Sequence, residues 1–187
     1  DSATNISGIS SVTATCFFGC GAGLTGIDAG FSPDSQENLV AGTGAGAAKD
    51  ADTCFNILLG CNSGCSLNAG DQNIILGCVA GACLQSGSDN VLLGRGAGKN
   101  VTTGCNVFIG RYAGLCATTG SRNVSIGSPS GGRSFGCGAF TGSYNTTMGD
   151  CSGINITSGN RNTFIGHYAG ACNTTGSCNT AMGTYAL

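Results

Sequence analysis

The sequence predicts an all-β protein, a β-solenoid of about ten short coils with a period of about 17 residues. Three observations support this fold class. An N-x-x-x-G motif recurs along the chain, 35 of the 187 residues are glycine, and the stretches between glycines are too short to form helices. Helical repeats have longer periods, of roughly 33 to 47 residues. A stack of coils that each contribute one short strand satisfies all three observations.

The repeat units align on the asparagine that opens each motif. The steps between these asparagines are close to 17 residues, apart from two longer steps that indicate insertions near 24–37 and 131–144. We assign residues 15–187 to the solenoid and residues 1–14 to an extended N-terminal segment. The asparagines are Asn38, Asn56, Asn73, Asn90, Asn106, Asn123, Asn145, Asn162 and Asn179, and Thr15 stands in the same place upstream.

One strand follows directly after each asparagine, which we number as repeat position 1. From Asn56 onward, position 2 is β-branched and position 4 is a large aliphatic residue, as in Val91 and Leu93. Residues two apart in a strand point to the same face of the sheet. The pattern therefore predicts that positions 2 and 4 form the buried column of the solenoid.

The remaining repeat positions fit a narrow coil with tight turns. Glycine at positions 5 and 9 allows a positive φ without a steric penalty. Position 8 is alanine or serine, which suits a coil with little room inside. Examples of this small residue are Ala80, Ala97, Ala113 and Ala169.

The asparagines themselves predict a ladder in which stacked side-chain amides form hydrogen bonds between coils. The alternative is that asparagine only tolerates the geometry of a turn at this point. The ladder is the preferred hypothesis because asparagine occupies this position in nearly every unit. Its predicted members are Asn56, Asn73, Asn90, Asn106, Asn123, Asn145, Asn162 and Asn179.

The segment NTFIGHYAGACNTTGSCNTAMG, from Asn162 to Gly183, resembles the N-T-x-x-G repeats of phage tail fibres and of large bacterial surface proteins. It is more distantly similar to the β-roll heads of trimeric autotransporter adhesins, whose repeats are shorter. The resemblance extends over roughly residues 38–187. It implies an extracellular fibre or adhesin, often a trimer, and it implies no particular ligand.

Several classes of binding protein do not fit the sequence. The stretch VLLGRGAGKN, residues 91–100, looks like a phosphate-binding loop, but Leu93 replaces the first required glycine and Asn100 the hydroxyl residue. The net charge is −2 without a basic stripe, which argues against nucleic acid. Apolar runs of about four residues are far too short to cross a membrane. We expect no cofactor and no bound metal, since C-x-x-C pairs are absent and His167 is the single histidine.

Enzymatic activity is also not expected. The nine acidic residues are scattered over insertions and loops, and His167 stands at position 6, where other coils carry Arg95 and Arg111. Acid–base catalysis would need paired carboxylates or a histidine beside a nucleophile.

Thirteen cysteines indicate a secreted protein, because reducing compartments rarely accommodate so many without metals. A chain that begins with Asp1 fits removal of a signal peptide. We expect disulfides between stacked or nearby positions. The candidate pairs are Cys61 with Cys78, Cys65 with Cys83 and, less securely, Cys172 with Cys178. The odd number leaves at least one thiol free or bonded to another subunit, with Cys16 and Cys20 as the intersubunit candidates.

N-x-[ST] sequons make the protein a candidate glycoprotein. Asn123 and Asn145 also carry sequons, but they stand in the predicted ladder, where a glycan would break the stacking. The preferred glycosylation candidates are therefore Asn5, Asn100, Asn155 and Asn173.

The function predicted from these features is that of a structural subunit of an extracellular filament. The chain reaches its last residue within a unit, and we expect residues 1–14 of the next subunit to complete that coil head to tail. The alternative for this end is a truncated or proteolysed chain. The alternative function is an adhesin or tail-fibre shaft, as a trimer, that binds surface glycans, with Tyr112, Tyr168 and Phe108 as its contact residues. The preferred role of these three aromatic residues is instead to fill space between coils or subunits. Ice binding through the threonine pairs is a third, weaker hypothesis.

Overall fold

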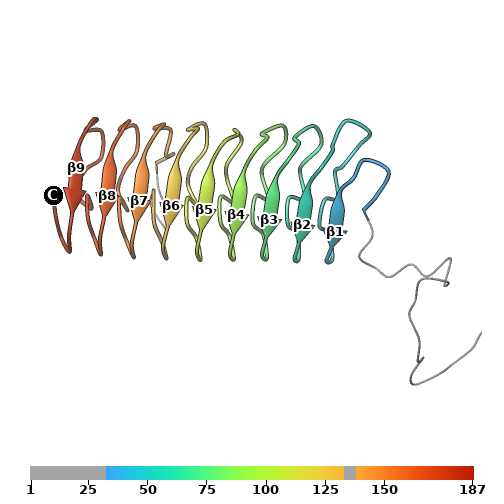
Figure 1. Ribbon diagram of the computed structural model, residues 1–187, viewed down its shortest axis with the longest axis horizontal. Coiled ribbons are helices and arrows are strands. Elements are labelled where there is room, and N and C mark those ends of the chain that lie inside the picture. Colours follow the sequence, from blue (N-terminus) through green and yellow to red (C-terminus); the bar gives the residue numbers. More distant parts are fainter. Residues whose placement is uncertain (1–32, 133–137) are drawn as a thin grey trace, which may run out of the picture.

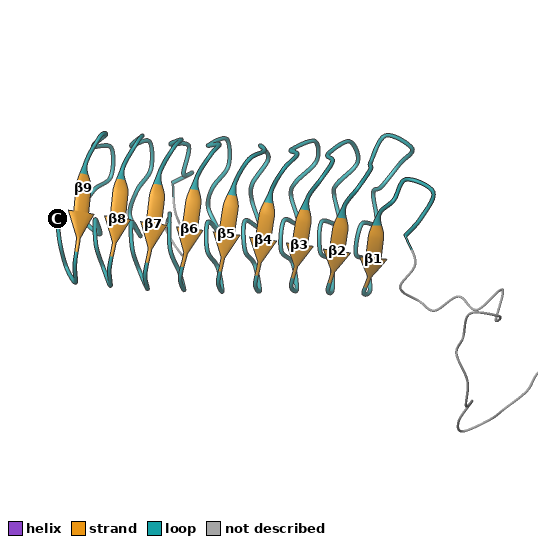
Figure 2. Cartoon of the chain, viewed as in Figure 1, coloured by secondary structure: helices purple, strands orange, loops and turns teal. Residues whose placement is uncertain are grey.

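The computed structural model describes residues 33–132 and 138–187. These residues form one parallel sheet of nine strands arranged in chain order, which confirms the predicted β-solenoid. Figure 1 shows the strands side by side in a single row, and Figure 2 shows that turns and loops make up the rest of each described coil. The strands are β1 Leu39–Ala41, β2 Ile57–Leu59, β3 Ile74–Leu76, β4 Val91–Leu93, β5 Val107–Ile109, β6 Val124–Ile126, β7 Thr146–Met148, β8 Thr163–Ile165 and β9 Thr180–Met182.

The predicted N-terminal segment 1–14 and the unit that opens at Thr15 lie outside the described residues. The insertion near 131–144 does not disturb the stack. Val124 pairs with Thr146 in register across the insertion, just as the first residues of neighbouring strands pair at all the remaining steps. Phe140 forms a parallel bridge with Ala117, and the register of β6 with β7 is kept across the insertion.

The prediction that positions 2 and 4 form the buried column was wrong. In β4 the middle residue, Leu92, is fully buried, whereas Val91 and Leu93 on either side are only partly buried. The reason is that the asparagine at position 1 points inward, and alternation along the strand then places position 3 inward as well. The buried strand column is Leu58, Ile75, Leu92, Phe108, Ser125, Thr147, Phe164 and Ala181.

A second apolar column, at position 12, lies in the return part of each coil. It consists of Leu67, Leu84, Val101, Ala117, Phe140 and Ile156, all fully buried. The apolar members of the two columns belong to one core cluster. In two neighbouring coils their sizes compensate, because the coil with Phe108 has the small Ala117 and the coil with Ser125 has the large Phe140. The predicted small residues at position 8 are also buried, Ala97 among them.

Glycine at position 5 is required by the close approach of successive coils. Gly94 has a φ of 126°, and a Cβ atom there would lie 2.6 Å from the carbonyl oxygen of Gly110. The positive φ and this short distance each exclude a residue with a side chain at this position. Other positive-φ positions are occupied by residues with side chains. The residue directly before each ladder asparagine adopts a φ near 60° in every described coil, as Asp89 does at 61°.

Candidate interaction surface

The asparagines form a continuous hydrogen-bonded ladder inside the solenoid. The Oδ1 atom of each asparagine accepts the backbone N–H of the asparagine in the next coil. Asn73 accepts in this way from Asn90 at 3.0 Å, and the same bond occurs at each step from Asn38 to Asn179. The Asn90 Nδ2 atom also donates to Asn73 Oδ1, at 3.0 Å. The ladder hypothesis therefore describes the structure better than the turn alternative.

Each ladder side chain also closes its own coil. The Nδ2 group of Asn73 donates to the carbonyl of Gly87, at 3.0 Å, three residues before the next asparagine. Asn145 makes the matching bond to Gly159, at 2.8 Å. An amide can accept from the next coil and donate within its own coil at once, which explains why the ladder side chains from Asn38 to Asn162 are buried without cost from missing partners.

A second ladder of side chains, which sequence analysis missed, runs along position 16. The carboxylate of Asp71 accepts the backbone N–H of Cys54 at 2.7 Å, and Ser88 accepts from Asp71 at 3.0 Å. Further along, Asn160 accepts from Ser143 at 2.8 Å. The acceptors are Asp, Ser or Asn, and Gly104 interrupts the series, so a search for an invariant residue could not find it. Where the bond forms, the signal is a short side chain with an acceptor oxygen two positions before the ladder asparagine.

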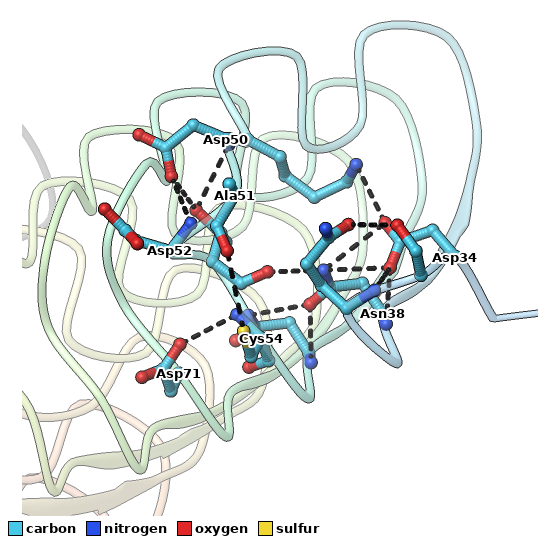
Figure 3. A network of polar contacts seen from close by, with 12 residues as sticks. Asp34, Asn38, Asp50, Ala51, Asp52, Cys54 and Asp71 are labelled. Atoms are coloured by element: carbon cyan, nitrogen blue, oxygen red, sulfur yellow. Dashed lines mark hydrogen bonds and ion pairs between the residues drawn. The ribbon is translucent and has the colours of Figure 1, made fainter.

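At the β1 side, Asp34 takes the place of a preceding ladder asparagine (Figure 3). Its Oδ1 atom accepts both the N–H of Asn38, at 2.9 Å, and the side-chain amide, at 3.1 Å. The ammonium group of Lys49 lies 3.2 Å from Asp34 Oδ2 and balances the charge. Asn38 therefore has its full set of ladder partners without an asparagine before it.

The polar network in Figure 3 shifts two pKa values. Burial raises the pKa of Asp34, but hydrogen bonds from Asn38, Lys49 and Gln36 outweigh it and lower the pKa below its ordinary value. Burial, followed by the negative charges of Asp71 and the other nearby aspartates, raises the pKa of the Cys54 thiol. A raised pKa means that a smaller fraction of the Cys54 thiol is in the reactive thiolate form at neutral pH.

The residues that directly precede the ladder asparagines form an exposed line along one corner of the solenoid, which we call the corner column. They all lie at the positive φ described above, and all are exposed. Tyr144 stacks between its column neighbours, with the guanidinium carbons of Arg122 and Arg161 at 5.5 and 5.6 Å from its ring centroid. From β1 to β9 the members are Glu37, Phe55, Gln72, Asp89, Cys105, Arg122, Tyr144, Arg161 and Cys178.

Aromatic residues also gather at positions 6 and 7 near β8 and β9. The rings of Tyr168 and Tyr185 stack at 5.2 Å with an interplanar angle of 7°, and His167 packs edge-on against both. His167 Nε2 lies 3.7 Å from Asp150 Oδ2, and both side chains are about half exposed. A hydrogen bond with Cys151 raises the pKa of Tyr168, and the charge of Cys151 acts in the same direction.

The predicted aromatic contact residues divide between surface and core. Tyr112 and Tyr168 are partly exposed, and the guanidinium group of Arg111 lies 4.6 Å from the ring centroid of Tyr112. Phe108 is fully buried, so its assignment to a contact patch was wrong. It stands at position 3, which faces the interior.

The structure forms no disulfide among the described cysteines. Cys61 and Cys78 occupy matching, exposed places in adjacent coils, as predicted, but both are unbonded. Cys65 and Cys83 are turned to different partners. Cys65 Sγ donates to the carbonyl of Ala82, at 3.4 Å, and Cys83 Sγ contacts Asn100 Oδ1, at 3.7 Å.

The remaining candidates are the pair Cys172 and Cys178 and the two intersubunit cysteines. Cys172 and Cys178 are exposed and unbonded, so this candidate pair is not formed either. The intersubunit candidates Cys16 and Cys20 lie outside the described residues.

The structure separates the glycosylation candidates. Asn173 is buried at position 12, and its two side-chain polar atoms are enclosed without a partner, so its choice as a glycan site was wrong. Asn155 is half-buried, and its Nδ2 donates to the carbonyl of Ala171 at 2.7 Å. Asn100 is also half-buried. Asn123 and Asn145 are buried in the ladder, as expected, and Asn5 lies outside the described residues.

Within residues 33–132 and 138–187, no three His, Cys, Asp or Glu side chains come together as metal ligands. No helix in this part of the chain is long and apolar enough to span a membrane. No protein-family model matches the sequence, and neither the curated proteins nor the solved structures contain a match. The ladders and the corner column are therefore the features on which a functional proposal can rest.

Proposed function

We propose that this protein is a structural subunit of an extracellular filament, in which copies join head to tail along the solenoid axis. The observation that carries the proposal is the ladder itself. Within the chain, each coil accepts hydrogen bonds from the next coil with the same atoms, so the stack has one direction and its two ends differ. Contacts between unlike ends are heterologous, and they generate open filaments when the rotation between copies does not close a ring.

The surface of β9 supports this assembly. Among the strands of residues 33–132 and 138–187, β9 pairs with β8. The coil that contains it exposes Met182, Tyr185 and Leu187, each with more than half of its surface accessible, at 68%, 69% and 61%. Exposed apolar side chains beside a strand edge favour addition of another strand.

The strand that would be added is residues 1–14 of the next copy. At β1 the ladder position before Asn38 is already filled by Asp34, so the ladder of one copy cannot continue directly into Asn38 of another. A separate N-terminal strand avoids this conflict. An extracellular location follows from the thirteen cysteines, with Cys16 and Cys20 as candidates for bonds between subunits.

Negative-stain electron microscopy of the protein, with and without a reductant, tests this proposal. We expect long filaments that lack branches, and shorter filaments under reductant. Deletion of residues 1–14 removes the added strand and leaves the coils from β1 to β9 intact. The deletion variant is therefore expected to retain its β-type circular dichroism but to form no filaments. Filaments of unchanged length from this variant would contradict the proposal.

A glycan-binding adhesin, as a trimer, is the second candidate. The observation in its favour is Tyr144, an exposed ring held between two arginines, since aromatic faces stack on sugar rings. Short particles or trimers in the micrographs, together with binding to a glycan array that is lost in Tyr144→Ala, would favour this function over the filament.

A further inference from the structure

The charged residues are separated along the solenoid axis. Residues 33–90 contain six acidic side chains and one basic side chain, a net charge of −5, whereas residues 91–187 contain one acidic and six basic side chains, a net charge of +5. The small overall charge of −2 hides this division. Because coils follow chain order, the β1 to β3 part of the molecule is acidic and the β4 to β9 part is basic.

The corner column repeats this division on one exposed line. Glu37 and Asp89 lie on one side of its midpoint, Cys105, and Arg122 and Arg161 lie on the other. Among the described members of the column, from Glu37 to Cys178, Cys105 is the central one, and it is exposed. A column of this kind is complementary to itself when one copy is reversed.

We propose that two copies of this chain pair side by side and antiparallel along the corner column, with the two-fold axis at Cys105. Asp89 of each copy then faces Arg122 of the other, and Cys105 faces its counterpart. Phe55 faces Arg161, a cation–π arrangement. Gln72 faces Tyr144, and both can form hydrogen bonds.

The regular spacing of the coils makes these contacts simultaneous. Strands in a sheet are separated by about 4.8 Å, so a match at one pair brings the other pairs into line. The insertion does not break this spacing, because β6 and β7 remain in register. A parallel arrangement would instead place Asp89 opposite Asp89 and Arg122 opposite Arg122, and facing like charges oppose association.

This pairing is independent of the proposed function, since it uses the side of the solenoid rather than its ends. It predicts association that weakens with salt. Sedimentation velocity under reductant is expected to show dimers at about 20 mM salt and mostly monomers at about 500 mM, where screening is nearly complete over a few ångströms.

Charge reversal tests the pairing itself. Asp89→Arg and Arg122→Asp are each expected to weaken the dimer about tenfold or more, because each creates two like-charge pairs across the axis. The double variant D89R/R122D restores opposite charges and is expected to dimerise like the parent. Arg95→Asp changes the net charge as R122D does but lies outside the column, so it should alter the dimer constant by less than about twofold.

These substitutions suit the fold, since Arg122 and Arg161 already adopt the same φ near 60°. Circular dichroism of each variant checks this. Failure of the double variant to dimerise, dimerisation unaffected by salt, or a monomer under all conditions would overturn the proposal. An unchanged lateral dimer in R122D would also oppose it, whereas loss of filaments in the 1–14 deletion concerns only the proposed function.

Oxidation of Cys105 provides a second, geometric test. Diamide oxidises two facing thiols to a disulfide and takes up their two protons and two electrons. We expect a cross-linked dimer that contains a Cys105–Cys105 peptide by mass spectrometry and that is lost in Cys105→Ser. Cross-links formed only through cysteines outside the column, such as Cys61, would contradict the antiparallel register.

Discussion

The ladder asparagine combines two properties that few side chains share. Its Oδ1 accepts from the next coil, and its Nδ2 donates to a carbonyl that closes the coil. Aspartate lacks the donor and would bury a charge. Asp34 shows the condition under which aspartate is accepted, since it lies at the β1 side, is partly exposed and is paired with Lys49. The residue type is therefore fixed by the need to accept and donate in a dry interior.

Substitution of one ladder asparagine tests this requirement. Asn90→Ala leaves the backbone N–H of Asn106 and the carbonyl of Thr103 without partners inside the solenoid. Buried unpaired groups cost roughly 1–3 kcal/mol each, so we expect unfolding free energy to fall by at least about 2 kcal/mol. Urea unfolding followed by circular dichroism measures the change.

Asn68→Ala is the matched control for that substitution. Asn68 is exposed and stands outside the ladder, so its removal should change the stability by no more than about 0.5 kcal/mol. Equal effects of the two substitutions would show that the ladder bonds add nothing beyond a turn preference.

At the scale of the strand, the inward direction of the position 1 side chain decides which of the following strand residues point inward and which point outward. Three-residue strands are too short to choose a face by hydrophobicity alone. Leu92 and Leu93 are chemically identical, yet one is fully buried and the other is not. The ladder sets the phase of each strand, and the side chain at position 3 follows it inward.

The two leucines therefore provide a direct test of this phase. Leu92→Ala should lower the unfolding free energy by about 2–5 kcal/mol, because it leaves a cavity in the core. Leu93→Ala should lower it by less than about 1 kcal/mol, since its side chain is already partly solvated. Thermal unfolding of the two variants measures both. A larger loss for Leu93 would restore the original assignment of positions 2 and 4 to the interior.

At the scale of the whole molecule, each coil touches mainly its two neighbours. The strand contacts join only consecutive strands, from β1·β2 to β8·β9. Stability in such arrays is close to a sum of coil and interface contributions. Coils should therefore be removable as units, provided that the register of the ladder is kept.

Deletion of residues 73–89 removes one complete coil and joins Gln72 to Asn90. We expect the shortened chain to fold, with a β-type circular dichroism spectrum and a urea m-value reduced in proportion to the lost surface. Deletion of only residues 73–80 removes part of a coil and breaks the ladder, and it should lose cooperative unfolding. Cooperative folding of both deletions would contradict the dependence on register.

The sequence by itself determined the fold class, the positions of the described strands, the small residues at position 8 and the ladder from Asn56 to Asn179, to which the structure adds Asn38. It could do so because each depends on a residue type that recurs at a fixed spacing. The asparagine, the glycine and the small residue each satisfy a local condition that no other residue meets equally well.

Only the tertiary structure decided which face of the strand is buried, because that depends on the inward direction of an amide. It also decided the position 12 column, whose members change size to compensate for position 3, and the ladder at position 16, whose residues share an acceptor but no identity. The acidic and basic parts of the sequence contribute to one exposed surface only because coil stacking places Asp89, Cys105 and Arg122 on one line. These properties arise between coils, where the sequence of a single repeat unit carries no signal.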